Sequence, residues 1–174
     1  VDLAHMRVPY PLEALGVIGP DDDGRFILAD CRRLGIRTRG LRIARRARTA
    51  FSHIVSVRGT GRRTIFHHAG GSAWLGVRDF DFARTQARLF LLGFIGLLER
   101  LDRPDARYGT ATARVLATAS NAGLVTAADV VSDLPRLRAL VPPALPHLDW
   151  FFVNELEAEA LTGISVRTRS GAPH

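Results

Sequence analysis

The stretch WFFVNELEAEALTG, residues 150–163, joins a short apolar run to an acidic, helix-forming segment without a linker. Trp150 to Val153 are residue types of a buried strand, and the composition after them predicts a helix that opens at Asn154. An Asn cap with Glu157 three positions later is typical of a capping box, in which each side chain binds a backbone N–H of the other residue. The stretch therefore predicts a strand that passes directly into a capped helix.

Strands and helices alternate upstream of this stretch. Continuous apolar runs predict strands buried on both faces, as in parallel sheets, and amphipathic or small-residue segments predict helices between them. The predicted strands are residues 12–18, 89–95, 124–131 and 150–153, and the predicted helices are residues 26–34, 110–122 and 132–140. The alternation predicts an α/β fold with parallel strands and right-handed crossovers.

Residues 36–69 have a different pattern. Apolar and polar side chains alternate from Thr49 to Val57, the segment RGTGR at 58–62 supplies turn residues, and TIFHH at 64–68 returns as a β-branched and aromatic run. We interpret residues 36–69 as an antiparallel β ribbon. It is inserted into one domain over residues 1–174, with 1–35 and 70–165 as parts of the α/β body.

The composition favours a cytoplasmic protein. Of 174 residues, 47% are hydrophobic, which is enough for a core, and the longest apolar stretch, Leu89 to Leu98, is too short to span a bilayer. The single cysteine, Cys31, excludes an internal disulfide. The net charge of +7 would suggest nucleic acid, but every one of the 24 basic residues is Arg, a pattern typical of coding bias. We expect no nucleic-acid or membrane partner.

Two acidic segments are candidates for chemistry. Asp21 to Asp23 stand in a Gly- and Pro-containing turn before a helix, where the helix dipole favours acidic residues, so we assign them no catalytic role. Asn154 and Glu157 have two compatible interpretations: a purely structural capping box, or groups that face phosphate and Mg²⁺ where a parallel strand ends. Without Lys the chain cannot contain a P-loop of the Gly-Lys-Ser/Thr type.

Four segments together resemble a known family. They are GVIGPDDDG at 16–24, LGIRT at 34–38, GGSA at 70–73 and NELEAEALTG at 154–163. The first is similar to Gly-x-Val-Gly-x-Asp-x-x-Gly, and the last to an Asn-x-x-Glu motif, both of the ribokinase-like (PfkB-type) carbohydrate kinases. The chain departs from that family at Arg37, where Asp is usual, and at Ser72, where Asn is frequent.

The resemblance implies a three-layer α/β/α body with a mostly parallel sheet and a small antiparallel β lid. It implies ATP-dependent phosphoryl transfer to a hydroxyl of a sugar or nucleoside-like substrate, with ATP and Mg²⁺ as cofactors. By resemblance, Asn154 approaches the nucleotide phosphates and Glu157 helps to place Mg²⁺ through water. Gly70, Gly71 and Ser72 would contact the sugar, and the lid would support a homodimer.

The resemblance also implies that parts of the kinase lie outside the chain. A sugar-binding Asp and a Gly-Gly-x-x-x-Asn stretch would precede Val1, and a Gly-Ala-Gly-Asp segment with the general base would follow His174. We therefore expect an internal fragment with no catalytic base, inactive by itself. The alternative is a degenerate or truncated homologue that acts as a dimerisation or binding module, in which Arg37 and Ser72 would be natural.

Overall fold

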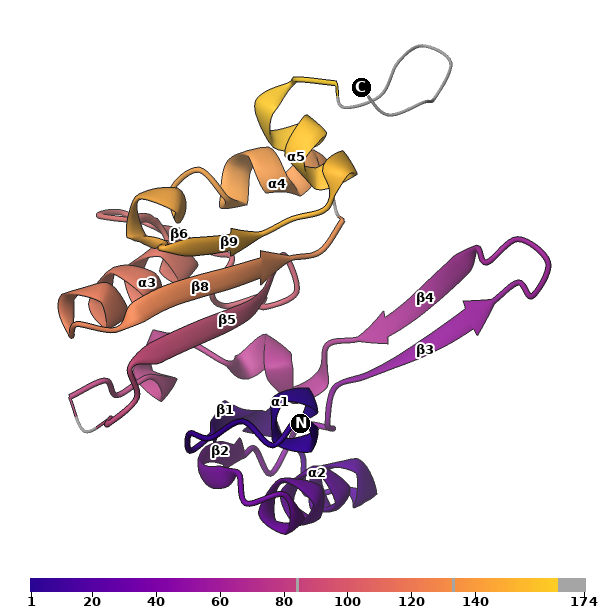
Figure 1. The fold of residues 1–174 in the computed structure, drawn as a ribbon, viewed down its shortest axis with the longest axis vertical. Coiled ribbons are helices and arrows are strands. Elements are labelled where there is room, and N and C mark those ends of the chain that lie inside the picture. Colours follow the sequence, from indigo (N-terminus) through magenta and orange to yellow (C-terminus); the bar gives the residue numbers. More distant parts are fainter. Residues whose placement is uncertain (84, 133, 166–174) are drawn as a thin grey trace. The chain divides into compact units, whose positions relative to one another are not determined.

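The structure is a computed structural model, which describes residues 1–83, 85–132 and 134–165. The chain forms two compact units, one over residues 1–75 and one beginning at Gly76, and each is described by itself. Figure 1 shows the course of the chain through both units. Within the described ranges, no helix is long and apolar enough to cross a membrane.

The first unit is built on a parallel strand pair. After a short helix α1 (Asp2–His5), β1 (Glu13–Ile18) leads through helix α2 (Asp22–Arg33) to β2 (Arg37–Ile43), which pairs parallel with β1. The helix ends before Gly35, whose φ of 70° is the left-handed conformation that terminates helices. Apolar side chains of β1 and α2, among them Val17 and Cys31, are buried.

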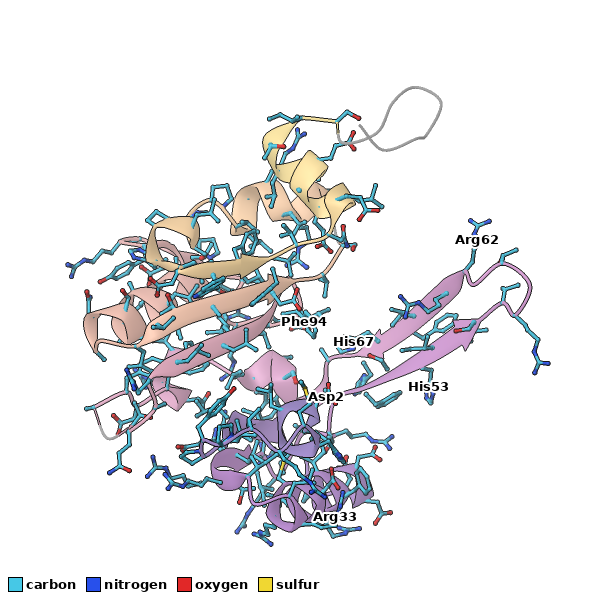
Figure 2. The ribbon with its side chains drawn as sticks, in the orientation of Figure 1. Asp2, Arg33, His53, Arg62, His67 and Phe94 are labelled. Carbon is cyan, nitrogen blue, oxygen red and sulfur yellow. The ribbon has the colours of Figure 1, made fainter. Side chains whose placement is uncertain are left out.

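An antiparallel hairpin follows in the same unit. Strands β3 (Phe51–Ser56) and β4 (Arg63–His68) pair in register from Phe51 opposite His68 to Ser56 opposite Arg63. Figure 2 shows the hairpin with His53 and His67 on its two strands and Arg62 near its tip. Its apolar side chains are exposed, including Ile54, Ile65 and Phe66, so the hairpin has no core of its own.

The predicted ribbon over residues 36–69 is wrong at its beginning. Residues 37–43 form β2, which pairs parallel with β1, and only β3 and β4 make the antiparallel ribbon. The reason is that α2 returns the chain to the side of β1. Two-stranded pairing leaves arginines such as Arg37 and Arg42 in solvent, so the sequence of β2 lacks the apolar pattern of a central strand.

The second unit contains a three-stranded parallel sheet of order β5-β8-β9. Its strands are β5 (Leu89–Ile95), β8 (Val125–Val130) and β9 (Trp150–Phe152), and its helices are α3 (Ala111–Asn121), α4 (Leu134–Leu140) and α5 (Glu155–Thr162). Short elements complete it: η2 (Val77–Asp79), β6 (Pro104–Asp105), β7 (Gly109–Thr110) and η3 (Leu145–His147). Ile95, Leu101, Leu116 and Leu137 are fully buried and form the core of this unit.

The predicted strands and helices of this unit are confirmed, with shifts at their ends. The helix expected from residue 132 begins at Leu134, which leaves Ser132 in the loop after β8. The antiparallel pair β6–β7 has two residues in each strand, too few to produce a periodic pattern in the sequence.

Candidate functional site

The loops after β8 and β9 lie at one edge of the parallel sheet. The two strands pair from Ala127 opposite Trp150 to Asp129 opposite Phe152, so they end side by side. Ser132 lies two residues beyond β8, and Asn154 lies two residues beyond β9. In open α/β sheets, ligands bind at the carboxyl ends of the strands, which makes this edge the candidate site.

Asn154 and Glu157 form the predicted capping box, which the structure confirms. Asn154 has extended backbone angles, its side-chain oxygen accepts a hydrogen bond from the Glu157 N–H at 2.9 Å, and Glu157 Oε2 accepts from the Asn154 N–H at 2.9 Å. The helix ends at Gly163 with a φ of 73°. The capping box fixes the direction of α5 and holds the Glu157 side chain against its first turn.

Ser132 completes this cluster from the neighbouring loop. Its hydroxyl donates a hydrogen bond of 2.6 Å to Glu157 Oε1, and the Asn154 side-chain NH₂ lies 3.4 Å from the same hydroxyl oxygen. Glu157 is buried, with 4% of its surface exposed, whereas Ser132 and Asn154 are exposed. We call these three residues the Ser–Asn–Glu cluster.

The sequence identified Asn154 and Glu157 as site residues but not Ser132. A hydroxyl in the loop after an apolar strand is common, and only the pairing of β8 with β9 brings this one to Glu157. Asp129, near the end of β8, makes a local contact in which its Oδ1 accepts from the Val130 N–H at 2.7 Å.

The cluster fits an indirect role toward Mg²⁺. Within residues 1–83, 85–132 and 134–165, no three His, Cys, Asp or Glu side chains gather into a metal-binding group. Mg²⁺ usually keeps several waters and is held by one or two carboxylates together with substrate phosphates. One carboxylate has about four lone-pair sites, and two of those of Glu157 are taken by Ser132 and Asn154. The remaining sites can accept hydrogen bonds from metal-bound water.

The other predicted site residues, Gly70, Gly71 and Ser72, belong to the first unit. They form a short 3₁₀ helix, Gly70–Trp74, directly after β4. The Gly71 N–H donates to the Arg48 carbonyl at 2.7 Å, and a Cβ on Gly71 would lie 2.5 Å from the Val17 carbonyl oxygen. This segment therefore packs backbone against backbone beside β1, in a different unit from the Ser–Asn–Glu cluster.

Asp21 connects the turn after β1 to the segment that leads into β3. Its Oδ1 accepts from the Gly24 N–H at 3.0 Å and from the Thr49 hydroxyl at 2.5 Å, and its Oδ2 accepts from the Thr49 N–H at 2.8 Å. The Thr49 hydroxyl in turn accepts from the Gly19 N–H at 2.9 Å. These hydrogen bonds, led by that of the Thr49 hydroxyl, lower the pKa of Asp21 to about 2. Asp21 is thus the N-cap of α2 and ties this helix to Thr49.

The pKa of Asp21 predicts a pH effect on stability. Because the folded-state pKa is lowered, the Asp21 contribution is fully present above the unfolded value of 3.8 and is lost as the pH falls through about 2. Asp21→Asn should therefore lower the denaturant midpoint at neutral pH and flatten its decline between about pH 4 and 2. Asp23→Asn, an exposed neighbour that removes the same charge without these hydrogen bonds, is the control. Superimposable pH profiles for wild type and Asp21→Asn would contradict the assignment.

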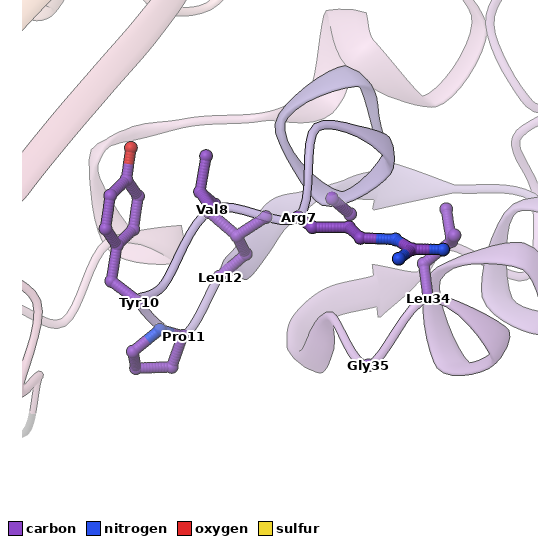
Figure 3. Close-up of a pocket in the computed structure, with 8 residues that line it drawn as sticks. Arg7, Val8, Tyr10, Pro11, Leu12, Leu34 and Gly35 are labelled. Carbon is purple, nitrogen blue, oxygen red and sulfur yellow. The ribbon is translucent and has the colours of Figure 1, made fainter.

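A shallow pocket in the first unit is not part of the candidate site. Its volume is about 270 Å³, and it is lined by Ala4, Arg7, Val8, Tyr10, Pro11, Leu12, Leu34 and Gly35 (Figure 3). Leu12 directly precedes β1, and Gly35 lies two residues before β2, so the pocket lies at the amino ends of these strands. Ligand sites of open α/β sheets lie at the opposite, carboxyl ends.

The chain is similar to carbohydrate kinases in sequence pattern and in structure. A model of the family described as pfkB family carbohydrate kinase matches residues 10–172, whereas no curated protein matches the chain. A PfkB protein from Polaromonas sp. JS666 is 22% identical with a TM-score of 0.72, and the match covers 97% of this chain and 57% of that one. A PfkB family carbohydrate kinase from Listeria grayi DSM 20601 is 14% identical with a TM-score of 0.73, and the match covers 96% and 53%.

A ribokinase from Cryptococcus neoformans var. grubii serotype A, solved in complex with ADP, is 24% identical with a TM-score of 0.65. Its match covers 91% of this chain and 45% of that protein. The chain thus spans about half the length of the solved structures that it matches. These similarities confirm the predicted ribokinase-like α/β fold, and the family match over residues 10–172 shows that the chain belongs to the pfkB family of carbohydrate kinases.

Proposed function

We propose that the whole protein transfers the γ-phosphoryl group of ATP to a hydroxyl of a sugar or sugar-like substrate. The observation that carries this proposal is the Ser–Asn–Glu cluster, in which a buried carboxylate lies under two exposed polar side chains at the carboxyl edge of parallel strands. Such an edge, with the amino end of helix α5 beside it, favours phosphate groups. Family membership supports the same activity.

In this proposal the two motif residues have different tasks. The Asn154 side chain is exposed, so its amide can bind a nucleotide phosphate while its oxygen caps α5. Glu157 orients metal-bound water through the carboxylate lone pairs that Ser132 and Asn154 leave open. Mg²⁺, when bound, neutralises charge on the transferred phosphoryl group. We assign no general base to the described residues.

The first unit would provide the sugar contacts. We propose that Gly70, Gly71 and Ser72 line the sugar site, where glycine backbone can approach a ligand closely. Ser72 places a hydroxyl where the family often has the longer side chain of Asn. Its polar group therefore reaches less far from the backbone. The β3–β4 hairpin would be the main part of the lid over the sugar, and β2, which pairs with β1, would belong to the α/β body.

A second candidate function is supported by the hairpin itself. Ile54, Ile65 and Phe66 are each more than half exposed, and a hairpin of two strands has unpaired edges. A homologue without kinase activity could use this surface for pairing with a second copy. The departures at Arg37 and Ser72 fit that alternative.

The decisive experiment compares two proteins in a coupled ADP-release assay with MgATP and a panel of sugars and nucleosides. One is the 174-residue chain, and the other is the longest product that its gene encodes. We expect no turnover by the chain and sugar-dependent turnover by a longer product, because we assign no general base to residues 1–83, 85–132 and 134–165, and such a base is typically worth about 10²- to 10⁴-fold. Turnover by the 174-residue chain would overturn our assignment of the base, and no turnover by either protein would favour the pairing module.

A further inference from the structure

We propose that Ser132 is a positioning residue of the phosphoryl-transfer site, which holds Glu157 and Asn154 in their working orientations. This inference rests on the proposed function, since the task of Ser132 is defined by the roles of the two motif residues. It adds to them a residue that the Asn-x-x-Glu motif does not contain and that lies 22 positions before Asn154 in the chain.

The first step concerns the Glu157 carboxylate. Each of its oxygens has a donor from a different loop: Oε2 accepts from the Asn154 N–H at 2.9 Å, and Oε1 accepts from the Ser132 hydroxyl at 2.6 Å. With the first bond alone, the carboxylate could rotate about its terminal torsion, which is a soft degree of freedom in Glu. The second bond fixes the plane of the carboxylate and therefore the directions of its remaining lone pairs.

The second step concerns burial. Because only 4% of the Glu157 surface is exposed, bulk water cannot replace a lost hydrogen bond to its carboxylate. A carboxylate oxygen without a donor would therefore lower the stability of the folded protein. Ser132 is exposed, and its hydroxyl supplies the donor for the buried Oε1.

The third step concerns Asn154. Its side-chain oxygen is engaged with the Glu157 N–H, which leaves the NH₂ group to contact ligands. That NH₂ group lies 3.4 Å from the Ser132 oxygen, a long contact that steers the amide without saturating its donors. Ser132 thus touches both motif residues, and this follows only from the pairing of β8 with β9.

The kinetic test uses the longest gene product with three variants. Ser132→Ala removes the donor, Ser132→Thr keeps it, and Thr162→Ala is the matched control, because Thr162 donates its hydroxyl to the Ala158 carbonyl at 2.8 Å in the same helix, away from the cluster. We expect Ser132→Ala to raise the KM for MgATP about 10-fold, the size of effect typical of residues that orient metal-site ligands. The KM for the sugar should change less than about twofold, and Ser132→Thr should recover most of the loss.

A second readout uses the 174-residue chain and does not need turnover. Amide hydrogen exchange at Asn154 reports the bond to Glu157 Oε2, and exchange at Ala158 reports an ordinary bond of α5 to the Asn154 carbonyl. In Ser132→Ala we expect faster exchange at Asn154 with Ala158 unchanged, restored in Ser132→Thr. A purely structural hydroxyl would change both amides together.

The outcomes separate this inference from the function on which it rests. Unchanged exchange at Asn154 in Ser132→Ala, or an MgATP KM equal to that of Thr162→Ala, overturns the positioning role. Faster exchange at Asn154 in the 174-residue chain, together with no sugar-dependent turnover by the longest gene product, overturns the proposed kinase function but leaves the contact between Ser132 and Glu157 in place.

Discussion

Replacing Glu157 with glutamine is expected to lower phosphoryl transfer by about 10²-fold while helix α5 stays folded. Glutamine has nearly the shape of glutamate and can keep both contacts. Its carbonyl oxygen can accept from the Asn154 N–H, and its NH₂ can donate to the Ser132 oxygen, since a hydroxyl both donates and accepts. What the variant removes is the negative charge, together with acceptor sites for metal-bound water.

The measurement is steady-state turnover of the longest gene product over a range of Mg²⁺ concentrations, with the denaturation midpoint measured in parallel. Glu157→Ala provides the contrast, because it also removes the side-chain half of the capping box that accepts from the Asn154 N–H, whereas the Asn154 side chain can still accept from the N–H of residue 157. Glu159→Gln removes a charge from the same helix outside the cluster and should keep full activity. If Glu157→Gln retains wild-type turnover, the carboxylate has only its capping role.

The second large effect is expected from Gly71→Ala in the first unit. The added Cβ would lie 2.5 Å from the Val17 carbonyl oxygen, a distance that backbone atoms can relieve only by moving apart. The bond from the Gly71 N–H to the Arg48 carbonyl would be strained by the same movement. Overpacking of this kind costs about 1–3 kcal/mol, and we expect the upper part of this range because the obstacle is backbone rather than a flexible side chain.

Chemical denaturation monitored by Trp fluorescence and limited proteolysis of the first unit would measure this loss. Gly59→Ala is the matched control, because no atom lies within 4 Å of its added Cβ. That variant should stay within about 0.5 kcal/mol of wild type, as surface substitutions usually do. In an active protein, Gly71→Ala should also raise the KM for the sugar. Equal free energies of unfolding for the two variants would show that the segment accommodates the added Cβ without a loss of stability.

The sequence by itself determined the type and order of the main elements. Continuous apolar runs at β5 and β8 and the direct passage from β9 to α5 are local patterns, and local patterns encode strand, cap and helix. The capping box could be predicted in full because its two hydrogen bonds span only three residues. The hairpin β3–β4 was equally readable from period-two alternation around a glycine turn.

Only the tertiary structure decided which distant residues meet. The parallel pairing of β2 with β1 was hidden, because an arginine-rich strand at the border of a two-stranded sheet has no core-facing pattern to display. Likewise, nothing near Ser132 in the sequence points to Glu157. Their contact exists because β8 and β9 run parallel and end together, and such pairing depends on long-range packing that no local stretch of sequence encodes.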